Sequence, residues 1–80
     1  MKLPRDLSGQ ELAKILCRRW DYRIVHQIGS HIILQTETPS HHRISVPAHA
    51  TLRIGTLNAI VRSVSTHKSV GRDQLLESLT

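Results

Sequence analysis

A histidine follows a glycine–serine pair at the start of an apolar segment, in the sequence Gly29-Ser30-His31. An imidazole has an unperturbed pKa of about 6.5, so it can both accept and donate a proton near neutral pH. If the following segment is a strand, the backbone holds His31 more firmly than a loop would, which suits general acid–base catalysis. Gly-Ser is also ordinary turn chemistry. The same tripeptide is therefore compatible with a half-exposed polar histidine that has no catalytic role.

One reaction open to such a histidine is the cleavage of RNA without a metal ion, which needs a base for the 2′-hydroxyl proton, an acid for the leaving 5′-oxygen, and cations beside the phosphate. His31 is the candidate for one proton transfer, and Ser30 is a candidate for orienting its ring or the phosphate. Gly55 and Thr56 open a helix-like segment, where unpaired amides can bind an anion, and Arg53 lies just upstream. Plain helix initiation is the alternative explanation of the Gly-Thr pair.

The other histidines carry weaker signals. His49 is a candidate for a second acid–base group, although its place in a predicted loop favours a structural role. His41 and His42 also lie in a predicted loop, where adjacent side chains diverge and one metal ion would not take both. His26 and His67 carry no specific signal. Because the chain lacks a cysteine pair and has few carboxylates near these residues, we expect no metal site and no cofactor.

Arginine dominates the charge of the chain. Lysine and arginine number 11 against 6 aspartates and glutamates, which gives a net charge of +5, and most of these cations are arginines. The planar guanidinium matches phosphate geometry, so a small domain of this composition is expected to bind nucleic acid or an acidic protein. A domain that is merely basic is the alternative. The candidates for phosphate contacts include Arg23 and Arg43. Aromatic residues make up only 2%, so base stacking on several rings is not expected.

The length of the chain predicts one domain over residues 1–80, with a modest core. The single cysteine, Cys17, excludes an internal disulfide and a cysteine-rich zinc site. No apolar run is long enough for a membrane span, and the N-terminus lacks the apolar core of a signal peptide. We therefore expect a cytoplasmic protein with no membrane association.

Ser8 and Glu11 form the pattern of a capping box at the start of a predicted helix over Gly9–Arg19. Leu12 and Leu16 belong to an apolar stripe at helical spacing along this segment. The pattern predicts a helix that buries one face.

Three strands are expected next, over Tyr22–Ile28, His31–Thr36 and Arg43–Val46. Gly29-Ser30 is a two-residue hairpin connection, and Pro47 should end the third strand or mark a sheet edge because it has no amide proton. Alternation places Ile32 and Leu34 on one face of the second strand and His31 on the other. If helices cover the Ile32 and Leu34 face, His31 faces outward.

Two more helices complete the predicted order. Gly55-Thr56 starts the first, which has apolar residues at helical spacing, and Ser69 is expected to cap a short last helix that carries Leu75 and Leu76. A helix, a three-stranded antiparallel sheet, a helix and a short helix define an α+β two-layer sandwich, α-β-β-β-α(-α).

These features resemble the HicA (YcfA-like) toxin family of bacterial toxin–antitoxin systems. The resemblance covers about residues 5–79 and is carried, in order, by the amphipathic first helix, Gly29-Ser30-His31, Val46-Pro47-Ala48-His49, and Gly55-Thr56-Leu57 followed by Ile60. It implies a double-stranded-RNA-binding-domain-like fold and an mRNA interferase that is neutralised by a HicB-type antitoxin. It also implies that the functional histidine of the family corresponds to His31.

Two functions of different classes follow from the sequence. The first is a ribonuclease toxin that uses His31 without a metal ion on mRNA. The second is a catalytically silent RNA-binding module of the same fold, held to RNA by its basic surface. A protein-interaction domain is a third and weaker alternative, since its binding would depend little on RNA or salt. The outward histidine favours the ribonuclease.

Overall fold

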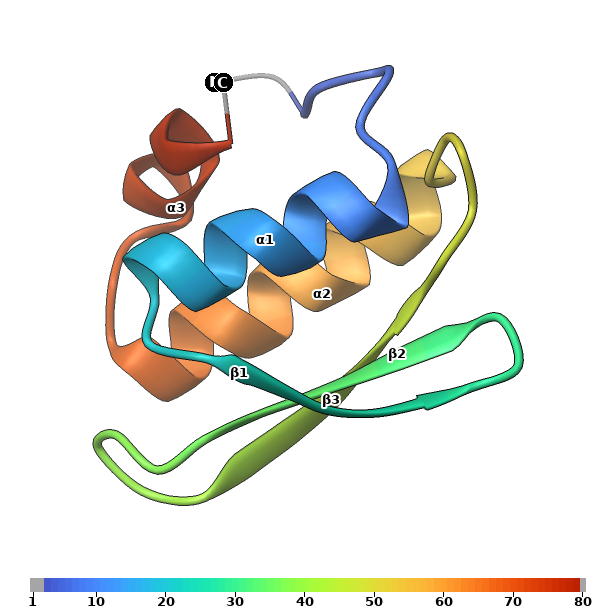
Figure 1. The fold of residues 1–80 in the computed structure, drawn as a ribbon. Coiled ribbons are helices and arrows are strands. Elements are labelled where there is room, and N and C mark those ends of the chain that lie inside the picture. Colours follow the sequence, from blue (N-terminus) through green and yellow to red (C-terminus); the bar gives the residue numbers. More distant parts are fainter. Residues whose placement is uncertain (1–2, 80) are drawn as a thin grey trace.

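Three strands follow the first helix and precede the other two in the computed structural model, which describes residues 3–79 (Figure 1). The elements are α1 (Gly9–Arg19), β1 (Arg23–Ile28), β2 (His31–Thr36), β3 (His42–Pro47), α2 (Ile54–Lys68) and α3 (Arg72–Ser78). This order confirms the predicted α+β fold of the double-stranded-RNA-binding-domain-like type. Among the described residues, every helix is too short or too polar to cross a lipid bilayer.

The capping box at the start of α1 forms as its residue spacing predicts. The Ser8 hydroxyl accepts a hydrogen bond of 3.0 Å from the Glu11 amide, and the Glu11 carboxylate accepts one of 3.2 Å from the Ser8 amide. Leu12 and Leu16 are each 1% exposed. Burying a leucine side chain contributes about 1.5–3 kcal/mol, so the apolar stripe fixes which side of α1 faces the sheet.

The first residue of α1 must be a glycine, because the helix begins directly against the end of β3. A Cβ atom at Gly9 would overlap the carbonyl group of Pro47. The Gly9 amide donates a hydrogen bond of 3.0 Å to the carbonyl oxygen of His49. This close approach ties the N-terminus of α1 to the chain just beyond β3.

The sheet has the order β1-β2-β3, and both pairs of neighbouring strands are antiparallel. Gly29 and Ser30 connect β1 to β2, and the φ of Gly29 is +57° while that of Ser30 is not positive. A positive φ at the first loop residue alone matches the type II′ hairpin turn. The predicted two-residue connection is therefore confirmed, and it places His31 directly opposite Ile28.

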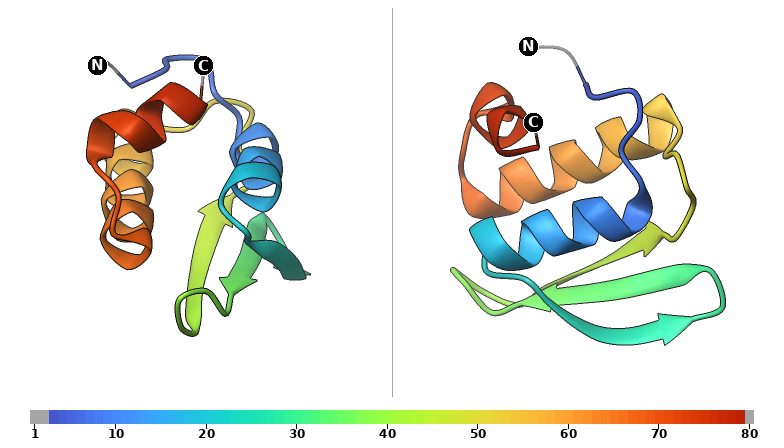
Figure 2. Two further views of the ribbon diagram at one scale, coloured as in Figure 1. Left: turned by 90° about the vertical axis from the view of Figure 1, so that its left-hand side faces the viewer. Right: turned by 45° about the horizontal axis from the view of Figure 1, so that its top comes forward.

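The helices all lie on one side of the sheet (Figure 2). Contacts join α1 to all three strands, α2 to β3, and α3 to α2. Ile32 and Leu34 of β2 are 3% and 0% exposed beneath the helices, whereas His31 is exposed. The predicted two-layer arrangement with an outward His31 is confirmed.

Two predicted boundaries are wrong. Ser69 does not cap the last helix: it ends α2 in the left-handed conformation, with φ +57° and its amide bonded to the carbonyl groups of Ser65 and Thr66. Gly71 precedes α3 instead, without a side-chain cap. His42, predicted in a loop, is the first residue of β3, because it pairs with Thr36 of β2.

Candidate active site on the open sheet face

No element of residues 3–79 covers the side of the sheet turned away from the helices (Figure 2). We call this side the open face. Directly paired residues in neighbouring strands point to the same face of a sheet, so the register defines its members. They are Arg23, His26 and Ile28 of β1, His31, Ile33 and Gln35 of β2, and Arg43, Ser45 and Pro47 of β3.

His31 lies at the end of the open face next to the β1–β2 turn. Its Nδ1 atom is 3.2 Å from the Ser45 hydroxyl of β3. A hydroxyl can donate to a bare Nδ1 or accept from a protonated one, so this contact is compatible with both charge states of the ring. The contact orients the imidazole, and its Nε2 atom has no hydrogen-bond partner within residues 3–79 and can face a substrate. His31 can therefore exchange a proton at an exposed and oriented position.

Ser45 is a site residue that the sequence analysis missed. Ile44 and Val46 are buried, so alternation along β3 turns Ser45 outward, but its place beside His31 depends on the register of β2 and β3. Ser30, the predicted partner of His31, lies in the turn, and its carbonyl oxygen accepts a hydrogen bond of 2.6 Å from the Ala48 amide. The hydrogen bond to the His31 ring thus comes from β3, and a role for Ser30 stays a prediction.

Two predicted phosphate ligands lie at the other end of the open face. Arg43 donates from its Nε and a terminal nitrogen to the Gln35 amide oxygen, at 3.1 and 2.8 Å. Arg23 pairs with Gln35 from the other side. Gln35 is four residues beyond His31, which corresponds to about 13 Å along a strand. The two arginines therefore extend the face that carries His31 rather than touching its ring.

Glu37 closes this end of the site. Hydrogen bonds from Gln35 and from His41, at 2.8 and 3.2 Å, stabilise the carboxylate and lower its pKa. The charge of Arg23 acts in the same direction. Glu37 therefore carries a negative charge beside the arginines near neutral pH and limits the basic surface at its edge.

Arg53, Gly55 and Thr56 lie apart from the sheet residues. Arg53 precedes the first helical residue of α2, Ile54, and makes no side-chain capping bond. The start of α2 and the β1–β2 turn lie at the same end of the molecule, with the start of α1 between them (Figure 1). The structure therefore divides the predicted site into two groups: one on the open face and one at the N-terminus of α2.

His42 shows what a structural histidine looks like in this protein. Its Nδ1 is 2.8 Å from the Tyr22 hydroxyl, and its Nε2 is 3.2 Å from the Ser63 hydroxyl. The ring also stacks on His67, with 4.3 Å between centroids. Burial lowers the pKa of His42, and the charges of His67 and Lys68 lower it further.

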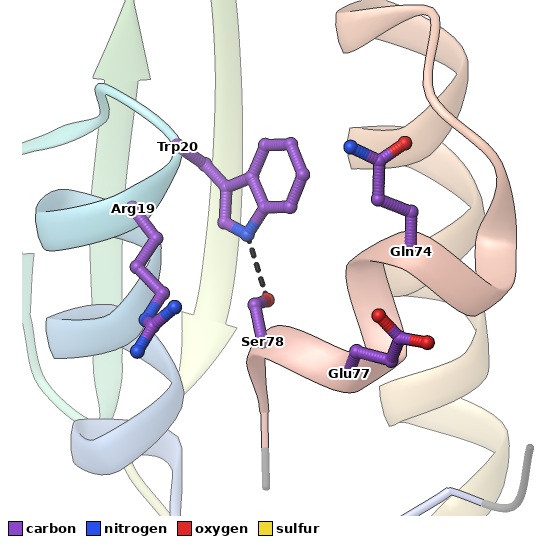
Figure 3. A pocket seen from close by; sticks show the side chains of 5 residues that line it. All are labelled: Arg19, Trp20, Gln74, Glu77 and Ser78. Atoms are coloured by element: carbon purple, nitrogen blue, oxygen red, sulfur yellow. Dashed lines mark hydrogen bonds between the residues drawn. The ribbon is translucent and has the colours of Figure 1, made fainter.

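The hollow between α1 and α3 is lined by Arg19, Trp20, Gln74, Glu77 and Ser78 (Figure 3). The Trp20 indole donates a hydrogen bond of 2.8 Å to the Ser78 hydroxyl, which in turn donates to the Leu75 carbonyl. These bonds attach α3 to the end of α1. The hollow lies on the helix side of the sheet, away from His31, and its contacts serve packing.

Within residues 3–79, no cluster of three or more histidine, cysteine or acidic side chains is arranged to hold a metal ion.

Comparison with known proteins identifies the family of this chain. A sequence model of the family described as "HicA toxin of bacterial toxin-antitoxin" matches residues 9–65, from the start of α1 into α2. Comparison with curated proteins and with solved structures gave no match.

The fold and the site define a small double-stranded-RNA-binding-domain-like protein whose exposed sheet face carries histidines and arginines. The chain belongs to the HicA toxin family. It is thus the toxin of a toxin–antitoxin system, which implies a cognate antitoxin.

Proposed function

We propose that this toxin is a metal-independent endoribonuclease that cleaves mRNA and uses His31 for proton transfer. One observation supports the proposal above all: His31 is exposed on a paired strand, its Nδ1 is held by Ser45, and no other residue in the described part of the chain bonds its Nε2. A histidine in this setting combines fixed orientation with access for a polymer, and both are required of a general acid or base.

The reaction is an in-line transesterification within RNA. The 2′-oxygen bonds to phosphorus while its proton passes to a base, and the bond from phosphorus to the 5′-oxygen breaks as that oxygen receives a proton from an acid. The products are a 2′,3′-cyclic phosphate and a 5′-hydroxyl end. His31 performs one of these two proton transfers, and nearby cations stabilise the charge that develops on the phosphate.

The two groups of predicted phosphate ligands serve binding rather than chemistry. Arg23 and Arg43 are about 13 Å from His31 along β2, so they contact the RNA backbone at some distance from the scissile bond. Arg53, Gly55 and Thr56 offer a side chain and unpaired amides at the start of α2, a common arrangement for anion binding. Together with Ser30 in the turn, they give the RNA several separate points of attachment.

The antitoxin is of the HicB type and acts in the cytoplasm by covering the open face. Blocking access to His31 is sufficient for inhibition, because the ring lies at the surface. The arginines of this face attract an acidic partner, which speeds association more than it increases affinity. A complex with the product of the adjacent reading frame should suppress cleavage and protect β2 from solvent.

The central experiment compares purified protein with its His31→Gln variant on RNA in excess EDTA. We expect cleavage by the native protein, loss of cleavage in the variant, and circular dichroism spectra that coincide. His41→Gln is a matched control, because His41 is an exposed loop histidine bonded to Glu37 and lies outside the open face. Equal cleavage by native protein and His31→Gln would refute the assignment. RNA binding without cleavage by the native protein would instead identify a silent RNA-binding module.

A further inference from the structure

β1 contains a bulge of one residue at Val25. Ile24 pairs with Leu34, but the next pair joins His26 to Ile33, so Val25 is an extra residue in β1. Side chains alternate between the faces of a strand, and one extra residue reverses this alternation beyond the bulge. Without the bulge, His26 would share the helix side of the sheet with Ile24. With it, His26 lies on the open face.

The bulge makes His26 a diagonal neighbour of His31. Ile28 pairs with His31, and His26 pairs with Ile33 two positions further along β2. Residues in this relation have Cα atoms about 7–8 Å apart, and their Cβ atoms are somewhat closer. Both histidines are exposed. Within residues 3–79, the His26 ring has no hydrogen-bond partner, so both of its nitrogens are available to a ligand.

Among the nine residues that define the open face, every residue with a permanent charge is cationic. Arg23 of β1 and Arg43 of β3 lie toward the far end of the open face, and the β3 residues beside His31, Ser45 and Pro47, are uncharged. None of the nine residues that define the open face is acidic. A phosphodiester placed between the two rings thus meets no carboxylate of the open face, and Glu37 is bonded to Gln35, toward the other end of β2 from His31.

We propose that His26 is the second proton-transfer group of the active site and acts on the opposite side of the scissile phosphate from His31. The proposal rests on the ribonuclease function proposed above, in which His31 performs only one of the two proton transfers. His26 performs the other. One ring accepts the 2′-hydroxyl proton while the other donates a proton to the departing 5′-oxygen. Each turnover leaves the two rings with exchanged protonation states, which water restores when it opens the cyclic phosphate or after product release.

His49 is the competing candidate for this role. It follows β3 by two residues, but it lies in the irregular segment beyond the strand, where its carbonyl oxygen is bonded to the Gly9 amide. His26 is held within the paired part of the sheet. The paired backbone of β1 keeps the Cα atom of His26 at a fixed distance from that of His31, which two coordinated proton transfers require.

The test compares His26→Gln, His31→Gln and His49→Gln with the native protein, using His41→Gln as control. The measurements are RNA cleavage at saturating substrate across pH 5–8, RNA affinity and circular dichroism. We expect native activity to depend on pH as a bell-shaped curve, which reports one acid and one base. His26→Gln should lose about 10²-fold or more in rate and one limb of the bell, with RNA affinity and the spectrum unchanged.

A ribonucleoside 3′-(4-nitrophenyl phosphate) then assigns the roles. Its phenolate leaves without a proton, so a variant that lacks only the acid should recover most of its rate on this substrate. A variant that lacks the base should remain slow. Recovery by either His26→Gln or His31→Gln, but not by both, confirms a two-histidine site.

The outcomes separate the two proposals. If His31→Gln cleaves RNA as the native protein does, the ribonuclease function assigned to His31 fails. If His31→Gln is inactive while His26→Gln keeps the native rate and both limbs of the bell, only the role of His26 fails. Loss of RNA affinity without loss of rate at saturation would make His26 a phosphate contact and overturn the proposal. Loss of a limb in His49→Gln instead of His26→Gln would do the same.

Discussion

His31 and His42 lie on opposite faces of the same sheet and differ in almost every respect that matters for chemistry. His31 is exposed, and its ring makes one hydrogen bond within residues 3–79, to Ser45. His42 is bonded at both nitrogens and stacked on His67, and burial lowers its pKa. A ring with both nitrogens occupied cannot accept a substrate proton without breaking its own contacts. Whether a ring nitrogen is open to a substrate thus separates the catalytic candidate, His31, from the structural histidine, His42.

Substitution of the exposed histidine, His31, should have the largest effect on RNA cleavage. His31→Gln should reduce RNA cleavage by about 10²–10⁴-fold, the usual contribution of a general acid or base. Its free energy of unfolding should stay within about 0.5 kcal/mol of the native value, as for other surface substitutions. Cleavage rates in EDTA and urea unfolding curves measure the two quantities. A large decrease in the free energy of unfolding would mean that His31, like His42, has a structural role.

The structural histidine should show the reverse pattern. His42→Ala leaves the buried Tyr22 hydroxyl and the Ser63 hydroxyl without their partner and removes the stacking contact with His67. We expect the free energy of unfolding to fall by about 1–3 kcal/mol, while RNA cleavage well below the melting temperature changes little. His41→Ala, measured in the same urea titration, should be nearly neutral. A stable but inactive His42→Ala would contradict the comparison.

Acid should destabilise the protein through His42. Because its pKa in the folded state is lowered, the unfolded chain binds a proton more readily, so the stabilising contribution is complete above about pH 6.5 and is lost as the pH falls through the folded-state pKa. The free energy of unfolding should therefore decrease between about pH 7 and pH 5. In His42→Gln, this decrease should be smaller. Equal slopes in both proteins would exclude His42 as the cause.

The arginines of the open face should affect binding rather than rate. Arg43→Gln should weaken RNA binding and reduce the slope of log affinity against log salt concentration by about 1, as expected when one phosphate contact is lost. Arg72→Gln is the matched control, because Arg72 belongs to α3 and donates to Asn58. Equal slopes for the two variants would remove Arg43 from the RNA contacts.

A substitution at the start of α2 should have the smallest effect, a change in RNA affinity. A Cβ atom at Gly55 would meet nothing within 4 Å, and alanine favours a helix over glycine by up to about 1 kcal/mol. Gly55→Ala should therefore fold at least as well as the native protein. A fewfold decrease in RNA affinity would show that the backbone of RNA approaches these amides, whereas unchanged affinity would restrict binding to the open face.

Local signals made much of the fold predictable. The helix α1 matches its prediction at both ends, because Ser8 and Glu11 define its start and the pattern of leucines its length. The outward direction of His31 followed from simple alternation along β2. The last helix was placed less well, since Ser69 suits either end of a helix and only the packing of α2 decides that it closes that helix.

The parts that depend on strand pairing were not predictable. Ser45 and His31 are far apart in sequence, and their contact follows from the register of β2 with β3. The bulge at Val25 also leaves no mark in the local sequence, yet it decides which face His26 joins. The hydrogen bonds of His42 to Tyr22 and Ser63 require three separate segments of the chain to meet. To predict these contacts, one needs the register of the strands and the packing of distant segments, which residue types alone do not give.

The uncovered sheet has a consequence for how this toxin can be inhibited. The described hollows lie between α1 and α3, beside α2, where β1 begins and β2 ends, and between α1 and the first two strands, and His31 lines none of them. Small molecules bind tightly when a concave pocket surrounds most of their surface, and a sheet without walls contacts them from one side only. A protein that covers about 800 Å² has no such limitation. We therefore expect selective inhibitors of this toxin to be macromolecules.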